Sequence, residues 1–193
     1  MQKASAVAVF CGSRTGNNPA YRAAAEALGR GLAEAGIRLV YGGGGIGLMR
    51  VVADAALAAG GSVLGVIPEF LTRLEVAHER TTELVITDSM HSRKQRMFQE
   101  ADAFVSMPGG LGTMDETIEI ITWRQLRLHN KPVLICNVAD SAKPLLAAIE
   151  AAIAAGFAAP EARRLYEVLE GVPALLQRLR HLQPTARGEA VRL

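Results

Sequence analysis

A glycine-rich segment followed by a carboxylate is the part of this sequence best suited to chemistry. Residues 108–113 read Pro-Gly-Gly-Leu-Gly-Thr and follow a short apolar run that predicts a buried strand. Glycines at such a turn leave main-chain N–H groups uncovered, and the N-terminus of the helix expected to follow carries about half a positive charge. The natural occupant is an anion, above all a phosphate. Glu116 is expected in the first turn of that helix, where an ionised carboxylate could act as a base or stabilise a cation.

Glu116 also has a purely structural interpretation. Thr113-x-x-Glu116 has the spacing of a capping box, in which the glutamate returns to the N–H of the capping threonine. The spacing alone leaves both interpretations open, and they differ in where the Glu116 side chain points.

A basic segment is the second candidate. Residues 90–97 read Met-His-Ser-Arg-Lys-Gln-Arg-Met and are expected on a helix that follows a predicted strand. Arg93 and Arg96 are three residues apart and therefore share a helix face. Because this helix would begin at the same sheet edge as the 108–113 turn, Arg93 and Lys94 are candidates for binding a phosphate or a sugar. The alternative is a solvated basic face beside Glu100.

Four consecutive glycines at 42–45 form another loop. Gly42-x-Gly44-x-x-Gly47 matches the dinucleotide-binding fingerprint, with Glu69 lying 22 residues beyond Gly47. The match follows the second predicted strand rather than the first, which argues against a nicotinamide cofactor. We favour close approach of this backbone to a phosphate or sugar, with Gly43 and Gly44 at the contact, over a purely structural turn.

Other chemistry is disfavoured. The four histidines have no metal-ligand spacing, so we expect no metal. We also expect no cofactor. Ser13 lies outside any Gly-x-Ser-x-Gly nucleophile elbow, although a contact from Ser13 to a phosphate or hydroxyl fits its place in a glycine-containing loop.

Short apolar runs alternate with helical patterns along the chain. Continuous apolar strands separated by helices predict an α/β fold, a single-domain Rossmann-like doubly wound parallel sheet with helices on both faces. Such sheets bind ligands at the carboxyl ends of the strands, where the three glycine-containing turns fall. The expected strands are 5–10, 37–41, 62–67, 83–87, 103–107 and 132–136, and the expected helices are 19–35, 46–59, 89–100, 114–128, 143–155 and 172–182.

Composition limits the class of protein. With 193 residues, half of them hydrophobic, and a net charge of +2, we expect one domain over residues 1–183 and a disordered tail over 184–193. No apolar run approaches the roughly 20 residues of a membrane span. Two cysteines make no disulfide framework, which favours the cytoplasm. Most of the basic residues are arginines, which suit phosphate ligands, but the charge excess is too small to indicate a nucleic-acid surface.

Taken together, five segments resemble the LOG ("Lonely Guy") family of cytokinin riboside 5′-monophosphate phosphoribohydrolases. The resemblance extends from about residue 7 to residue 138. Some bacterial relatives look like AMP nucleosidases, and the family has often been labelled lysine decarboxylase. Arg50 departs from the pattern, since glycine often follows the Gly-Leu-Met triplet. The segments are Phe10-Cys-Gly-Ser, Tyr41-Gly-Gly-Gly, Gly47-Leu-Met, Met90-His-x-Arg-Lys-x-x-Met and Pro108-Gly-Gly-x-Gly-Thr-x-x-Glu, the PGGxGTxxE motif.

The resemblance implies a Rossmann-like homodimer that hydrolyses the N-glycosidic bond of a purine nucleoside 5′-monophosphate, adenine-type and including N6-prenylated forms, to free base and ribose 5-phosphate. It implies Arg93 and Glu116 as the catalytic pair. The alternatives are a non-catalytic nucleotide-binding or sensing module of the same fold and an NAD(P)-dependent reductase. The residues that the resemblance implies at the nucleotide are Glu75, Arg93, Lys94, Gly110, Leu111, Gly112, Thr113, Met114, Asp115, Glu116 and Thr122, to which the loop arguments add Ser13, Gly43, Gly44 and Gly109.

Overall fold

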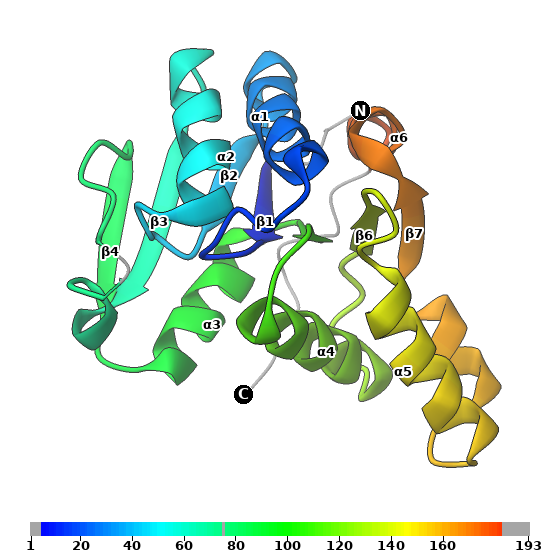
Figure 1. Cartoon of the computed structure of the whole chain (residues 1–193). Helices are drawn as coiled ribbons and strands as arrows, with labels where there is room; N and C mark the ends of the chain where they lie inside the picture. The colour runs from blue at the N-terminus through cyan, green and yellow to red at the C-terminus, as the bar shows by residue number, and fades with distance from the viewer. Residues whose placement is uncertain (1–4, 75, 183–193) are drawn as a thin grey trace.

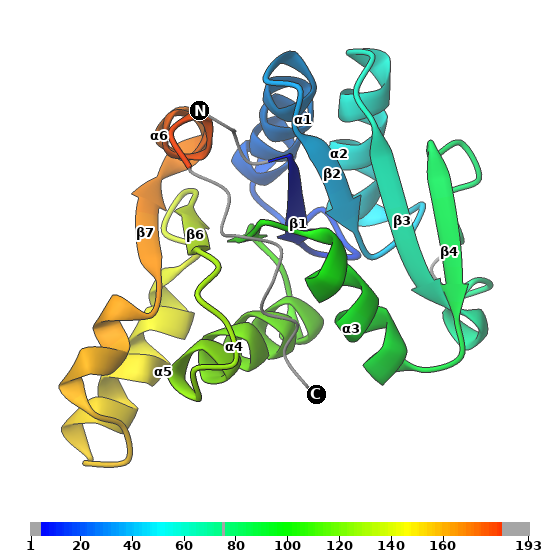
Figure 2. The same cartoon turned by 180° about the vertical axis from the view of Figure 1, so that it is seen from behind.

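The computed structural model describes residues 5–74 and 76–182. In this part of the chain, one sheet of seven parallel strands has the order β4-β3-β2-β1-β5-β6-β7 (Figures 1 and 2). The strands are β1 (Ala6–Phe10), β2 (Arg38–Tyr41), β3 (Val63–Pro68), β4 (Glu83–Thr87), β5 (Ala103–Ser106), β6 (Val133–Asn137) and β7 (Glu167–Glu170). The α-helices are α1 (Pro19–Glu34), α2 (Gly47–Ala58), α3 (Met90–Glu100), α4 (Leu111–Gln125), α5 (Lys143–Ala154) and α6 (Gly171–Arg180), with short 3-10 helices η1 (Glu69–Leu71) and η2 (Pro160–Arg164).

Helices cover both faces of the sheet, which confirms the predicted fold class. Helices α1, α2 and α6 lie on one face, and α3, α4 and α5 lie on the other (Figures 1 and 2). Strand β1 shows the cause, because Val7 and Val9 pack toward the first group while Ala8 and Phe10 pack toward the second. A strand buried on both faces needs apolar residues at every position.

Local signals set several element boundaries as expected. The side chain of Asn18 accepts a hydrogen bond from the Ala20 N–H at 2.9 Å and caps α1, and Pro19 occupies the first helical position. Gly36 has a φ of +68° just past the end of α1, which is the usual place for glycine in a helix stop. Ser89 caps α3 through the Ser92 N–H.

Strand β7 was not predicted. Its four residues alternate between half-buried and exposed and pair only with β6 at the sheet edge, so they lack the continuous apolar run of the other strands. The predicted tail over 184–193 lies outside the described residues. No helix in the described chain is long and apolar enough to cross a membrane.

The order of strands reverses between β1 and β5. From β1 the chain adds β2, β3 and β4 on one side, and from β5 it adds β6 and β7 on the other. The carboxyl ends of β1 and β5 are tied together, since Met107 N–H donates to the Phe10 carbonyl at 2.9 Å. Ligands of open α/β sheets bind at such a switch point.

Candidate functional site

The three glycine-containing turns meet at the switch point, as the sequence predicts. Gly12, after β1, donates to the Pro108 carbonyl at 3.1 Å, and its own carbonyl accepts from Leu48 N–H at 2.9 Å and Met49 N–H at 3.3 Å. A Cβ on Gly47, whose φ is +58°, would overlap the backbone of Ser13. Main-chain atoms of the first turn therefore already satisfy the N-terminus of α2.

The N-terminus of α4 is different, because its first main-chain N–H groups are left accessible. Gly110 is the N-cap residue, in extended conformation, and no side chain caps this end of the helix. Apart from the adjacent residues and the backbone of the helix itself, a Cβ added at Gly110 or Gly112 would meet no atom within 4 Å. The first N–H groups of a helix have no partner inside it, and here the glycines leave them accessible. This is the arrangement that binds a phosphate.

Helix α4 begins at Leu111, three residues before the predicted start. Glu116 is therefore the sixth residue of the helix, in its second turn and not in its first. The capping-box interpretation is wrong, because Gly110 is the N-cap and Thr113 already lies inside the helix. The extended backbone of Gly110 serves as the N-cap without a side chain, so the helix begins at Leu111. The capping-box prediction instead assumed that Thr113 would be the N-cap.

A buried hydroxyl pair holds α4 over the end of β5. The Thr117 hydroxyl lies 2.6 Å from the Thr113 carbonyl and 2.8 Å from the Ser106 hydroxyl, and Thr117 is fully buried. Behind Thr113 lies Gly109, where a Cβ would overlap the threonine side chain. Ser106 and Thr117 were not among the predicted site residues, and the available signal for Thr117 was a hydroxyl residue one helical turn after Thr113.

Arg93 is buried, with an exposed fraction of 5%. Its Nε donates to the Val66 carbonyl at 3.1 Å and its Nη2 donates to the Gly42 carbonyl at 2.9 Å. A Cβ at Gly42 would overlap Nη2, so the first glycine of the run is required to admit the guanidinium. The solvated-face interpretation of Arg93 is therefore wrong.

Arg93 from α3 and Glu116 from α4 both influence the pKa of Cys11, the residue that follows β1. Burial raises the pKa of Cys11, the charge of Glu116 raises it further, and the charge of Arg93 opposes the rise. Both charges are thus close enough to influence one thiol at the switch point. Glu116 is half-buried, and a carboxylate partly shielded from water is suited to stabilising positive charge on a ligand.

Lys94 connects the two helices that carry Arg93 and Glu116. Its Nζ lies 2.7 Å from Asp115 Oδ2 and 3.1 Å from Glu119 Oε2. Partial burial acts in the opposite direction, but these hydrogen bonds raise the pKa of Lys94 above its ordinary value. In this structure Lys94 and Asp115 therefore fasten α3 to α4, and their predicted contact with the nucleotide stays a prediction.

Gly43 and Gly44 are buried beneath residues 76–78, a segment we call the strap. His78 N–H donates to the Gly43 carbonyl at 3.0 Å, and Gly45 N–H donates to the Val76 carbonyl at 2.7 Å. The strap therefore occupies much of the main chain that was expected to meet a ligand, and the ligand contact of Gly43 and Gly44 stays a prediction.

The remaining predicted site residues fall in different places. Ser13 is exposed in the loop after β1, and Leu111 and Met114 lie in the first turns of α4. Thr122 is exposed farther along α4, where its hydroxyl donates to the Ile118 carbonyl at 2.8 Å. Glu75 lies outside the described residues. Across residues 5–74 and 76–182, no three His, Cys, Asp or Glu side chains are grouped to hold a metal ion.

Fold and site together define a Rossmann-like α/β protein with an open helix N-terminus, a buried arginine and a carboxylate at its switch point. Residues 49–179 match the family described as "possible lysine decarboxylase". The chain belongs to this family, the LOG family of cytokinin riboside 5′-monophosphate phosphoribohydrolases.

Curated relatives are similar over nearly the whole chain. A cytokinin riboside 5′-monophosphate phosphoribohydrolase of Rhodococcoides fascians is 43% identical over 90% of this chain and 88% of its own. An Arabidopsis thaliana enzyme of the same name is 43% identical over 92% of this chain and 82% of its own. A probable enzyme of that name from Oryza sativa subsp. japonica is 45% identical over 92% of this chain and 72% of its own.

Solved structures share the fold at much lower identity. A molybdenum cofactor binding protein from Rippkaea orientalis has a TM-score of 0.69 and 20% identity, covering 93% of this chain and 96% of its own. The molybdenum cofactor carrier protein of Chlamydomonas reinhardtii has a TM-score of 0.67 and 19% identity, covering 92% and 96%. At this identity the likeness shows the architecture alone.

Proposed function

We propose that this protein hydrolyses the N-glycosidic bond of adenine-type nucleoside 5′-monophosphates, N6-prenylated forms included, to the free base and ribose 5-phosphate. The observation that carries the proposal is the open N-terminus of α4, with Glu116 one turn further along the same helix and with the charges of Glu116 and Arg93 both acting on Cys11 at the end of β1. The names of the relatives support the same reaction.

The phosphate end of the nucleotide is assigned to the start of α4. Main-chain N–H groups of the first turn, beside Gly110 and Gly112, bind the 5′-phosphate without a side chain in the way. Binding energy gained at this remote group holds the ribose in position for the reaction.

Glu116 is assigned to the sugar. Breaking the bond between base and ribose develops positive charge on C1′, which a fixed carboxylate stabilises more strongly when water is excluded. The same carboxylate orients or deprotonates the attacking water, a contribution worth about 10²–10⁴-fold. Arg93 is held by two main-chain carbonyls and supplies a fixed positive charge toward phosphate or sugar.

Incubation with AMP, followed by detection of free adenine, tests the proposal. Glu116→Gln preserves size and most hydrogen bonding but removes the charge, and should lower kcat at least about 100-fold while AMP still binds. A Glu116→Gln protein that releases adenine at the rate of the unmodified protein contradicts the role of Glu116. Binding of AMP by the unmodified protein without release of adenine favours the sensing module instead.

We also propose that the protein is a homodimer that pairs through the outer face of α4. Leu111, Ile118 and Leu126 are 86%, 39% and 63% exposed and share this face. Thr122 lies one helical turn after Ile118. Because Thr122 and Glu116 are six positions apart on the helix, their side chains point about 120° apart. Thr122 is thus better placed for the nucleotide of a partner subunit. Leu126→Glu should convert a dimer to monomers in light scattering, and an unchanged mass contradicts this interface.

A cytoplasmic location is part of the proposal. Cys11 and Cys136 are both free and buried thiols, as is usual in a reducing compartment. Fractionation of cells that express the tagged protein tests the location.

A further inference from the structure

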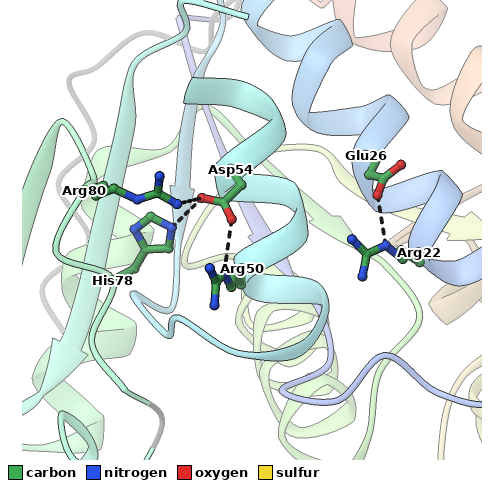
Figure 3. A network of polar contacts seen from close by, with 6 residues as sticks. All are labelled: Arg22, Glu26, Arg50, Asp54, His78 and Arg80. Atoms are coloured by element: carbon green, nitrogen blue, oxygen red, sulfur yellow. Dashed lines mark hydrogen bonds and ion pairs between the residues drawn. The ribbon is translucent and has the colours of Figure 1, made fainter. Parts of the chain in front are cut away.

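One buried histidine and one carboxylate join the strap to helix α2, outside the site described above (Figure 3). His78 Nε2 lies 2.9 Å from Asp54 Oδ1, and the histidine side chain is 4% exposed. The same carboxylate accepts from Arg80 Nη2 at 2.9 Å and from Arg50 Nε at 3.2 Å. Partial burial of Asp54 acts in the opposite direction, but hydrogen bonds from His78 and Arg50 hold the pKa of this carboxyl below its ordinary value. Asp54 is therefore an anion at neutral pH.

The strap that His78 fixes lies directly on the glycine loop. Gly44 and Ala77 pair as an antiparallel bridge, flanked by the bonds from His78 to Gly43 and from Gly45 to Val76. A Cβ at Gly45 would overlap the Val76 carbonyl, so only glycine admits the strap at this distance.

The glycine loop in turn fixes the arginine of the proposed site. The Gly42 carbonyl accepts from Arg93 Nη2 at 2.9 Å, and Gly42 directly precedes the residues that the strap covers. Contacts thus run without a gap from Asp54 to His78, from the strap to the loop, and from the loop to Arg93.

A histidine at position 78 carries an energetic cost. Its Nδ1 atom is buried with no hydrogen-bond partner in the described chain, and an unsatisfied buried polar atom costs about 1–3 kcal/mol. An apolar side chain of similar size would avoid that cost, so a requirement for the bond to Asp54 explains why a histidine stands here.

We propose that Asp54 and His78 are positioning residues, which hold the strap on the glycine loop and thereby fix the Gly42 carbonyl that orients Arg93. This inference rests on the proposed function, because Arg93 is assigned its role there. Misplacing a reacting group by about 1 Å costs up to about 100-fold in rate, so partial loosening of one hydrogen bond should cost about tenfold.

Paired substitutions at His78 test the proposal. His78→Phe keeps the bulk of the ring but removes the nitrogen that bonds Asp54, and should lower kcat for AMP hydrolysis about tenfold with KM changed less than threefold. His78→Gln places an amide nitrogen where Nε2 stood and should restore kcat to within about threefold of the unmodified protein. Asp54→Asn keeps a hydrogen-bond acceptor but removes the charge, and its kcat should fall between those of His78→Phe and His78→Gln. This variant replaces His78→Phe in the test if His78→Phe does not fold.

Glu26→Ala is the matched control. Glu26 pairs with Arg22 at 3.0 Å on the exposed face of α1, near Asp54 but without contact to the strap (Figure 3). This variant should change neither kcat nor KM.

Hydrogen exchange of peptides covering residues 42–47 and 76–80 gives a readout that needs no substrate. Exchange should be faster in His78→Phe and normal in His78→Gln and Glu26→Ala. Unchanged exchange in His78→Phe overturns the proposed link to the loop, and faster exchange with an unaltered kcat overturns the positioning role. If the unmodified protein releases no adenine, the proposed function fails, and exchange alone then decides whether the link to the loop exists.

Discussion

The carbonyl of Gly42 accepts a hydrogen bond from the buried guanidinium of Arg93, across 51 residues of sequence, and the space that a Cβ would need at Gly42 is occupied by that same guanidinium. A loop with the appearance of a phosphate-binding motif thus serves to hold a side chain. The glycine at position 42 is required by packing within the protein.

Gly42→Ala should therefore act through Arg93. The new methyl group displaces the guanidinium, and we expect kcat for AMP hydrolysis to fall about 10–100-fold together with a loss of about 1–3 kcal/mol in the free energy of unfolding. Gly60→Ala is the control, since Gly60 has a φ of +77° with no atom near its Cβ position and lies away from the site. It should lose stability without losing kcat. Steady-state kinetics and urea unfolding distinguish the two effects, and an active Gly42→Ala protein contradicts the role of Arg93.

Gly112→Ala should separate stability from binding. Gly112 is the second residue of α4, where alanine is the better helix former by about 0.5–1 kcal/mol. Its Cβ would enter the open space assigned to the 5′-phosphate. We expect a higher Tm but a KM for AMP at least about fivefold higher, equivalent to about 1 kcal/mol of binding. Gln125→Ala, at the exposed far end of the same helix, should leave KM unchanged. An unaltered KM in Gly112→Ala places the phosphate elsewhere.

Both cysteines should be unreactive in the folded protein. Burial, followed by the charge of Glu170, raises the pKa of Cys136 to about 12, and burial likewise raises the pKa of Cys11. Because the thiolate is the reactive form, an aromatic disulfide reagent at pH 8 should label neither thiol within minutes in native buffer and both in denaturant. Rapid labelling of one thiol before unfolding would show that its surroundings open.

The stability contribution of Glu167 should disappear in acid. Hydrogen bonds from Arg178 at 2.7 Å and 2.8 Å hold the pKa of this carboxyl below its usual value. A carboxylate with a lowered pKa in the folded state stabilises the protein above the unfolded pKa of about 4.3, and this contribution is lost as pH falls through the folded pKa.

Arg178→Met should accordingly lower Tm by about 2 °C at pH 7, and the difference from the unmodified protein should shrink toward zero near pH 3. Arg22→Met removes only an exposed pair within one helix and should shift Tm less at either pH. Thermal melts monitored by circular dichroism between pH 3 and 7 measure both. If the Tm difference between Arg178→Met and the unmodified protein does not change with pH, the assignment of a lowered pKa to Glu167 is contradicted.

Much of the architecture was predictable because its causes are local. The apolar runs, the cap at Asn18 and the stop at Gly36 each depend on residues within one or two turns, and they placed the helices and six strands to within about three residues. Strand β7 was not predicted, because a short edge strand buries few apolar side chains. The start of α4 was predicted three residues too late, because its N-cap is a glycine, which has no side chain to recognise in the sequence.

The amino-acid order by itself determined that an α/β sheet would gather three glycine turns at one edge, with Glu116 and Arg93 nearby, because periodicity and turn chemistry act over short stretches of chain. Only the tertiary structure decided what each turn faces. It buried Arg93 against Gly42, laid the strap over Gly43 and left the start of α4 open, since these contacts join residues tens of positions apart, and packing between elements sets them.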